Sequence, residues 1–265
     1  VPDSPGLIAG NHSFHRLLTD GIAVATRNGE GEDAYARARL FDFDDPGSNE
    51  WLVANQFSMV EGRHHRRADV VVFANGLPLG VLELKNPGSA AASAESAYRQ
   101  LRTYQHEIPA LFHHNEVLVA SDGLDARAAC VGAGWEYFLP WKTIEGDVTN
   151  PPGTSPLEVL IKGIFHPRRF LDIVRNFIVF SDETVTDPKT GQKTRALIKR
   201  VAKYHQYWAV NAAVESTVVA SSPDGDRRGG VVWHTQGSGK SLEMVFYAAK
   251  VMRDPRMTNP TLVFI

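Results

Sequence analysis

Along most of the chain, apolar residues either alternate with polar ones or recur at three- and four-residue steps. Alternation predicts half-buried strands, and the longer steps predict amphipathic helices. Asn75-Gly76-Leu77-Pro78 is a turn sequence between two β-branched runs, so residues 69–85 are expected to fold as a hairpin. Strands and helices that follow one another in this way favour an α/β layer architecture. In the first half the pattern predicts a short helix leading into a strand over 13–24 and broken at Asp20-Gly21, strands at 36–43 and 51–60, a helix over 94–108, and strands at 116–121 and near 136–139.

The segment 146–156, GDVTNPPGTSP, is the strongest break in the pattern. Beyond it the sequence predicts helices over 156–165 and 167–180, with Pro167 in a first turn, and a loop or short hairpin over 181–194. A helix over 197–214, a strand at 230–235, a glycine loop and a helix over 241–252 follow. We therefore expect one domain over 1–150, a helical junction over 151–195 and the beginning of another domain over 196–265.

The hairpin carries three charged residues, Asp69, Glu83 and Lys85, which strand pairing could bring to one place. Glu83 and Lys85 are two apart on a strand, so they share a face. Two carboxylates can hold a hard divalent cation, and a neighbouring Lys can steady a developing oxyanion or orient a water. This set suits phosphodiester cleavage. The alternative is a solvated sheet edge, where Lys and Glu discourage pairing with other strands.

The helix expected over 94–108 adds Gln100 and Tyr104, which are four apart and lie on one helical face. Asp69, then Glu-x-Lys at 83–85, then Gln-x-x-x-Tyr at 100–104 resembles the PD-(D/E)xK nucleases, in the branch with a Gln-x-x-x-Tyr helix. That family usually has Pro before the metal-binding Asp, and this chain has Ala68 there.

Residues 235–241, TQGSGKS, lie between an apolar run and an amphipathic helix. Glycines let backbone N–H groups turn toward an anion, and a helix N-terminus adds positive partial charge. Lys240 would reach the β- and γ-phosphates of ATP, and the Ser241 hydroxyl would ligate Mg²⁺. His234 stands where the strict Walker A sequence has Gly, a position that the helicase form of the loop relaxes. Gln206 precedes the loop, and its amide can both donate to and accept from an adenine edge.

Phrases over nearly the whole chain resemble the restriction (motor) subunit of type I restriction–modification enzymes. They include RRADVVVFANGLPLGVLELKNP, GIFHPRRFLDIVRNFIVF and VVWHTQGSGKSL. The resemblance implies a PD-(D/E)xK nuclease-like mixed sheet flanked by helices, followed by the start of a RecA-like helicase domain of superfamily 2. It also implies partners: double-stranded DNA and the methyltransferase and specificity subunits. By position it implies Mg²⁺ on Asp69, Glu83 and the Leu84 carbonyl; catalysis by Lys85 with support from Gln100 and Tyr104; adenine on Gln206; and ATP–Mg²⁺ on Thr235, Gly237, Ser238, Gly239, Lys240 and Ser241.

Composition limits which partners and which kinds of site are expected. The 265 residues carry a net charge of −2, so DNA binding has to come from local basic patches such as 63–67, RHHRR, for which a solvated loop is the alternative. A lone Cys130 excludes an internal disulfide and a cysteine-based zinc site and suits a reducing cytoplasm. His64 and His65 have no third ligand at a suitable spacing, so no zinc site is expected there. No run approaches eighteen apolar residues, which argues against a membrane span.

The absence of a first Met and the apolar run at 261–265 suggest a fragment of a longer protein. Later motor motifs are then expected beyond Ile265, and the isolated fragment is expected to lack productive ATP hydrolysis. Two other functions stay open at this stage. One is a P-loop kinase or other NTPase with a structural hairpin, and the other is a non-catalytic assembly module.

Overall fold

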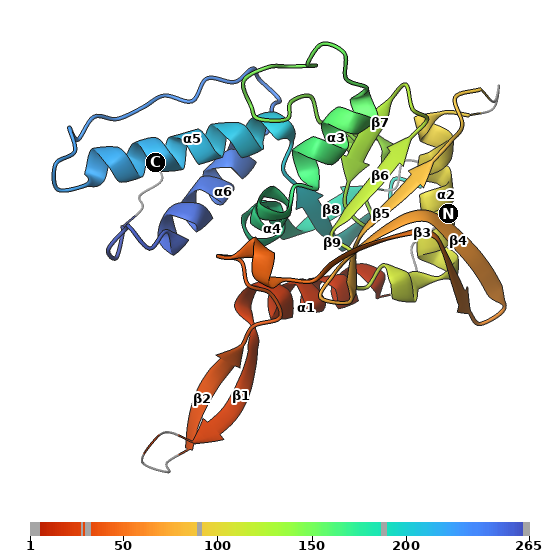
Figure 1. The fold of residues 1–265 in the computed structure, drawn as a ribbon, viewed down its shortest axis with the longest axis horizontal. Coiled ribbons are helices and arrows are strands. Elements are labelled where there is room, and N and C mark those ends of the chain that lie inside the picture. The colour runs from red at the N-terminus through yellow and green to blue at the C-terminus, as the bar shows by residue number, and fades with distance from the viewer. Residues whose placement is uncertain (1–5, 28, 30–32, 89–91, 187–189, 262–265) are drawn as a thin grey trace.

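Five strands form one mixed sheet in the computed structural model, and helices lie on both of its faces (Figure 1). The structure describes residues 6–27, 29, 33–88, 92–186 and 190–261, so residues 262–265 of the last apolar run lie outside it. The strand order is β3-β4-β5-β6-β7, in which only β5 and β6 run parallel. Their bounds are β3 Trp51–Glu61, β4 His64–Ala74, β5 Leu77–Leu84, β6 Val117–Ser121 and β7 Ala126–Ala129.

The turn between β4 and β5 explains the hairpin. Asn75 and Gly76 have φ of 47° and 76°, the left-handed values that a two-residue hairpin turn needs and that Asn and Gly adopt most readily. The Asn75 side chain also accepts the Glu50 N–H at 2.7 Å, which ties the turn to the chain before β3. The hairpin expected over 69–85 is confirmed.

Successive residues of a strand point to opposite faces, so each face of the sheet has its own core. Val81 belongs to the cluster under α2 (Ala94–Glu107), together with Leu101. Leu82 belongs to the opposite cluster, which contains α3 (Pro156–Ile164) and α4 (Pro167–Asn176). Burying one such large apolar side chain stabilises the fold by about 1.5–3 kcal/mol. The expected mixed α/β architecture is confirmed.

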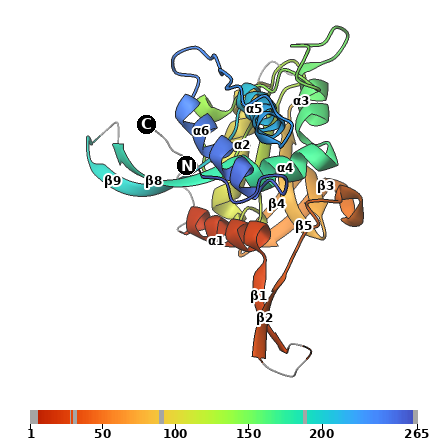
Figure 2. The same ribbon diagram turned by 90° about the vertical axis from the view of Figure 1, so that its left-hand side faces the viewer.

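An arm projects from this body after α1 (Leu7–Asp20), as two views at right angles show (Figures 1 and 2). It is a separate two-stranded sheet of β1 (Ile22–Arg27) and β2 (Asp33–Ala38). The break expected at Asp20-Gly21 is confirmed, because α1 ends there. The strand expected over 36–43 is only partly correct, since β2 ends at Ala38 and residues 39–43 form no strand.

The second half contains a further two-stranded sheet, β8 (Ile178–Thr186) with β9 (Lys193–Val201). The hairpin alternative for 181–194 is therefore correct. The helix expected over 167–180 is wrong after Asn176, and the helix expected over 197–214 is wrong before α5 (Tyr204–Ser221). In both places the residues pair in the hairpin instead. The domain boundaries at 150 and 195 stay predictions, and β9 runs across the second of them.

Two expected strands are absent from the described part of the chain. Residues 135–137 form a 3₁₀ turn, and Leu139 makes only an isolated bridge to Ala128 of β7. Residues 230–235 have no strand conformation, and Trp233 is 88% exposed. An apolar run becomes a strand only where neighbouring strands satisfy its backbone groups, and no described strand lies beside this one.

The helix α6 (Lys240–Arg253) follows the glycine loop as expected and packs beside α5 (Figure 1). Its Phe246 ring lies 5.5 Å from that of Phe177, and Lys250 Nζ lies 2.8 Å from Asp172 of α4. The segment with the glycine loop is thus packed on the helices that cover the sheet. Among the described helices, none is both long enough and apolar enough to cross a membrane.

Candidate active site and phosphate loop

The ends of β4 and β5 bring Asp69, Glu83 and Lys85 together. The backbone ladder between these strands ends at the pair Val70 and Leu82. Beyond it, Asp69 Oδ2 accepts the Leu84 N–H at 2.8 Å in place of a backbone carbonyl. Because this bond joins a side chain to the opposite strand, it fixes the Asp69 carboxylate next to Glu83-Leu84-Lys85. The carbonyl ligand expected from Leu84 stays a prediction.

Glu83 is buried, with an exposed fraction of 1%. Its Oε1 accepts from Lys85 Nζ at 2.8 Å, whereas its Oε2 is buried and has no hydrogen-bond partner among the described residues. Burial raises the pKa of Glu83 to about 7; the hydrogen bond from Lys85 opposes this rise, and the negative charge of Asp69 adds to it. An unpartnered carboxylate oxygen in such a place needs a proton or a cation.

Helix α2 supports Lys85 through a chain of hydrogen bonds. Lys85 Nζ donates to Gln100 Oε1, and Gln100 Nε2 donates to the Tyr104 hydroxyl. The Tyr104 hydroxyl in turn donates to the Arg67 carbonyl of β4 at 2.9 Å. Burial raises the pKa of Tyr104, so the phenol stays a neutral donor. The structure brings together all five residues expected at the site: Asp69, Glu83, Lys85, Gln100 and Tyr104.

One neighbour was not expected from the sequence. Gln56 on β3 donates from Nε2 to Asp69 Oδ1 at 3.1 Å. Its φ of 53° is left-handed in the middle of a strand, a conformation that costs a non-glycine residue about 1–3 kcal/mol. Counting residues from the turn between β3 and β4 could have identified this neighbour, because Gln56 and Asp69 are equally distant from that turn.

The basic cluster over 63–67 is divided by the alternation of β4. Arg66 pairs with Glu107 of α2, and His64 Nδ1 lies 3.6 Å from the same carboxylate. Arg63 and Arg67 are exposed. Arg67, two residues from Asp69 on the same strand face, has no described pairing with Glu107, whereas Arg66 holds α2.

The glycine loop at 235–239 leads directly into α6. Gly237 and Gly239 have φ of 80° and 95°, and a Cβ on Gly239 would come within 2.6 Å of Gln206 Nε2. Lys240 is exposed and donates to the carbonyls of His234 and Thr235 at 3.0 and 3.1 Å. The loop thus has the glycine conformations and the helix N-terminus that an anion site needs, without the preceding strand.

Gln206 is brought to the loop as expected, but its amide already has partners. Nε2 donates to the carbonyls of Ser238 and Gly239 at 3.2 and 3.1 Å, and Oε1 accepts the Lys203 N–H at 2.8 Å. Adenine recognition by Gln206 would require some of these bonds to exchange. Ser241 is exposed in the first turn of α6. The two predicted centres are separate. The described contacts join the loop to α5 and α6, whereas Asp69 bonds to β3 and β5, and Lys85, the partner of Glu83, bonds to α2.

Comparison with known proteins gives a consistent family. The model described as the N terminus of the type I restriction enzyme R protein matches residues 2–137, and a SWI2/SNF2 ATPase model matches residues 205–265. The endonuclease subunit of the type I restriction enzyme HindI of Haemophilus influenzae is 41% identical over 99% of this chain and 24% of its own length. The putative MjaIXP endonuclease subunit of Methanocaldococcus jannaschii is 31% identical over 99% of this chain and 26% of its own length. The chain therefore spans about a quarter of the length of these curated relatives.

Proposed function

The chain belongs to the family of type I restriction enzyme R proteins, and from this we propose that it carries a Mg²⁺-dependent endonuclease centre of the PD-(D/E)xK type. The substrate is double-stranded DNA, and the reaction is hydrolysis of a phosphodiester bond. In the whole protein, ATP-driven translocation of DNA by a RecA-like motor of superfamily 2 governs the cut. The complete complex includes methyltransferase and specificity subunits, and the proposed nuclease domain covers residues 1–150.

The observation that carries this proposal is the environment of Glu83. One of its oxygens faces Lys85, and the other is buried without a partner among the described residues, beside a second carboxylate. A structural sheet edge would expose these charges to water. A site for a hard cation instead needs convergent carboxylate oxygens that nothing else satisfies.

The roles of the side chains follow from their contacts. Asp69, Glu83 Oε2 and the Leu84 carbonyl would hold Mg²⁺, which when bound polarises the scissile phosphate and lowers the pKa of a water. Lys85 points its ammonium at the same centre and stabilises negative charge as the phosphodiester is attacked. Gln100 and Tyr104 keep Lys85 in place. The exposed Arg67 next to this centre supplies charge for docking the DNA backbone.

The ATP part of the proposal rests on the loop at 235–239. A cavity of about 650 Å³ reaches the loop and is lined there by Tyr204, Gln206, Gly239 and Leu242. Phosphates would take the place of the two carbonyls that now accept from Lys240. The base would enter beside Gln206. The HindI subunit is about four times as long as this chain, and strands that complete the motor sheet would come from the corresponding part of the whole protein.

The proposal is tested first by Mn²⁺ binding, followed by electron paramagnetic resonance. We expect the chain to bind Mn²⁺ at this centre, and Asp69→Asn or Glu83→Gln to weaken the binding by more than about 10-fold, because each removes a ligand charge. Glu158→Gln is the matched control, since Glu158 is an exposed carboxylate on α3 whose ion pair in the described part of the chain is with Lys162. Equal Mn²⁺ affinity in the parent and both site variants would favour a non-catalytic assembly role.

The same titration has a pH dependence. Mn²⁺ affinity should fall as the pH drops below 7, because the pKa of Glu83 is about 7 and a proton then competes with the cation for its oxygens. Glu83→Gln should remove most of this dependence between pH 6 and 8. A parent curve that is flat over this range would contradict the assigned role of Glu83.

The Gln56→Gly variant distinguishes the role of Gln56 in orienting Asp69 from its effect on the stability of the fold. Glycine adopts a positive φ without strain, so the free energy of unfolding should rise by about 1 kcal/mol. Loss of the amide that donates to Asp69 should weaken Mn²⁺ binding by about 10-fold, the range found for groups that orient metal ligands. Chemical denaturation and Mn²⁺ titration measure the two effects. A variant that loses stability but keeps its Mn²⁺ affinity would show that Gln56 serves only the strand.

A further inference from the structure

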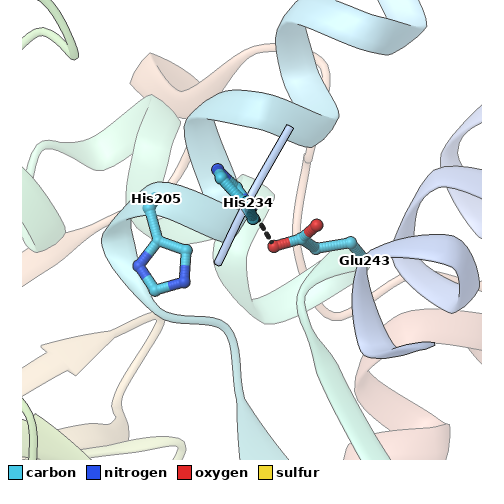
Figure 3. Close-up of side chains that lie close together, drawn as sticks. All are labelled: His205, His234 and Glu243. Atoms are coloured by element: carbon cyan, nitrogen blue, oxygen red, sulfur yellow. Dashed lines mark hydrogen bonds and ion pairs between the residues drawn. The ribbon is translucent and has the colours of Figure 1, made fainter. Parts of the chain in front are cut away.

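Two histidines and one glutamate, from α5, the residue before the glycine loop and α6, meet beside that loop (Figure 3). His205 lies on α5 next to Gln206, His234 directly precedes Thr235, and Glu243 lies in the first turn of α6. One ligand atom from each lies within 4.8 Å of the other two. None of these three belongs to the predicted nuclease or nucleotide-binding residues.

The contacts bring the donor atoms toward one point. His234 Nδ1 lies 2.7 Å from Glu243 Oε1, and the rings of His205 and His234 meet edge-on with centroids 5.0 Å apart. Glu243 is buried, with an exposed fraction of 6%, and both histidines are half-buried. In the described part of the chain, His234 is the only basic side chain in an ion pair with Glu243, so no Lys or Arg neutralises this buried carboxylate.

Two imidazole nitrogens and one carboxylate oxygen form a donor set typical of Zn²⁺ sites that keep one open coordination position. Mg²⁺ strongly prefers oxygen ligands, so this set differs in kind from the carboxylates of Asp69 and Glu83. Ligand atoms around tetrahedral Zn²⁺ lie about 3.4 Å apart. The three ligand atoms here lie within 4.8 Å of one another, and the His234–Glu243 pair is 2.7 Å apart, so small side-chain rotations would reach that spacing. We infer that His205, His234 and Glu243 bind one transition-metal ion of the Zn²⁺ class.

The consequence concerns the glycine loop. His234 precedes residues 235–239 and Glu243 follows them, while His205 belongs to the helix whose Gln206 holds the loop carbonyls. An ion bound to all three would fasten both ends of the loop to α5. Because the unfolded chain does not hold these ligands together, such an ion stabilises the fold in proportion to its affinity.

The test uses Zn²⁺ by calorimetry and Co²⁺ by visible absorption, in a chain whose nuclease carboxylates are replaced (Asp69→Asn with Glu83→Gln). We expect the chain to bind one equivalent of either metal. Bound Co²⁺ should show the visible absorption bands of a four-coordinate ion, and Zn²⁺ should raise the melting temperature. His205→Ala and His234→Ala should each weaken Zn²⁺ binding by more than about 10-fold, since losing even an orienting partner costs that much. His166→Ala, an exposed histidine ahead of α4, should have no effect.

Glu243→Gln distinguishes a metal site from a merely structural pair. The amide oxygen still accepts a hydrogen bond from His234, so the fold and the loop contact are kept. Lost Zn²⁺ binding in this folded variant supports the metal site. Unchanged Zn²⁺ binding in Glu243→Gln, or in both histidine variants, overturns it, as does a parent chain that binds no Zn²⁺. Circular dichroism confirms that each variant is folded.

Discussion

The Glu83→Gln variant of the whole restriction subunit should lose DNA cleavage and at the same time unfold less readily than the parent. Cleavage in the assembled complex should fall by at least about 100-fold, the cost of removing one principal electrostatic group from an active site. The loss follows from the missing negative charge on Oε2, the oxygen that is buried without a partner among the described residues.

The gain in stability has the opposite origin. The pKa of Glu83 is raised from 4.5 to about 7, first of all by burial. Below pH 4.5 the carboxyl is protonated in both the folded and the unfolded chain, and no penalty exists. As the pH rises toward 7 the unfolded chain ionises first, and above 7 the folded chain carries the full cost of a buried charge. Gln carries none, so the variant should be more stable by about 1–3 kcal/mol at pH 8 and equally stable at pH 4.

Two measurements distinguish the change in stability from the loss of cleavage. Urea denaturation at pH 8 and pH 4, without divalent metal, gives the stability difference, and DNA-dependent ATPase of the complex reports whether the motor is intact. We expect Asp69→Ala and Glu83→Gln to retain the ATPase, and Glu158→Gln to retain both activities. Cleavage by the Asp69→Ala complex at the parent rate would show that the site assignment is wrong.

Local patterns were enough to predict which residues come together at the proposed nuclease centre. The Asn75-Gly76 turn sets the register of the hairpin, and helical periodicity places Gln100 and Tyr104 on one face. Each of these features depends on residues close in sequence. Gln56 could have been found by counting from the turn, but its left-handed backbone could not, because a glutamine within a strand pattern gives no indication of a positive φ.

The errors lie where distant residues decide the structure. The run 197–201 has helix-forming residues on both sides, yet Lys199 is buried and donates to Asn11 Oδ1 at 2.8 Å and to Glu116. Burial alone would raise the pKa of Glu116, but the charges of Lys199 and His15 hold it below its usual range. These buried bonds hold β9 to α1 and to the residue just before β6, and no pattern within residues 193–201 indicates them.

In the run 230–235, by contrast, a strand was expected and none forms. Its apolar residues suit a buried parallel strand, and such a strand needs neighbours on both sides. In the described part of the chain Val231 and Trp233 are each 88% exposed. The strand expected over 230–235 is therefore wrong for this structure, because a strand depends on pairing that these residues do not supply to one another. The glycine loop still forms, because the contacts of Gln206 and Lys240 hold it independently of a strand.

The Lys240→Ala variant of the whole subunit should lose ATP hydrolysis by at least about 100-fold, because phosphoryl transfer depends almost entirely on positioning and charge stabilisation. Lys240 stands at the first residue of α6 and now donates to two loop carbonyls, which phosphates would replace as acceptors. In the present chain, affinity for a fluorescent ATP analogue should fall by more than about 10-fold, as expected when one charge-assisted contact worth 1.5–3 kcal/mol is lost.

The nuclease centre provides the internal control for this variant. Lys240 makes no described contact with Asp69, Glu83 or α2, so Mn²⁺ binding at those carboxylates should be unchanged. Lys162→Ala, which removes an exposed lysine of α3, should alter neither nucleotide nor Mn²⁺ binding. Cleavage by the assembled Lys240→Ala complex should nevertheless disappear, because the cut depends on translocation in the proposed mechanism. Normal cleavage without ATPase would separate the two centres, and the coupling between motor and nuclease would then have to be rejected.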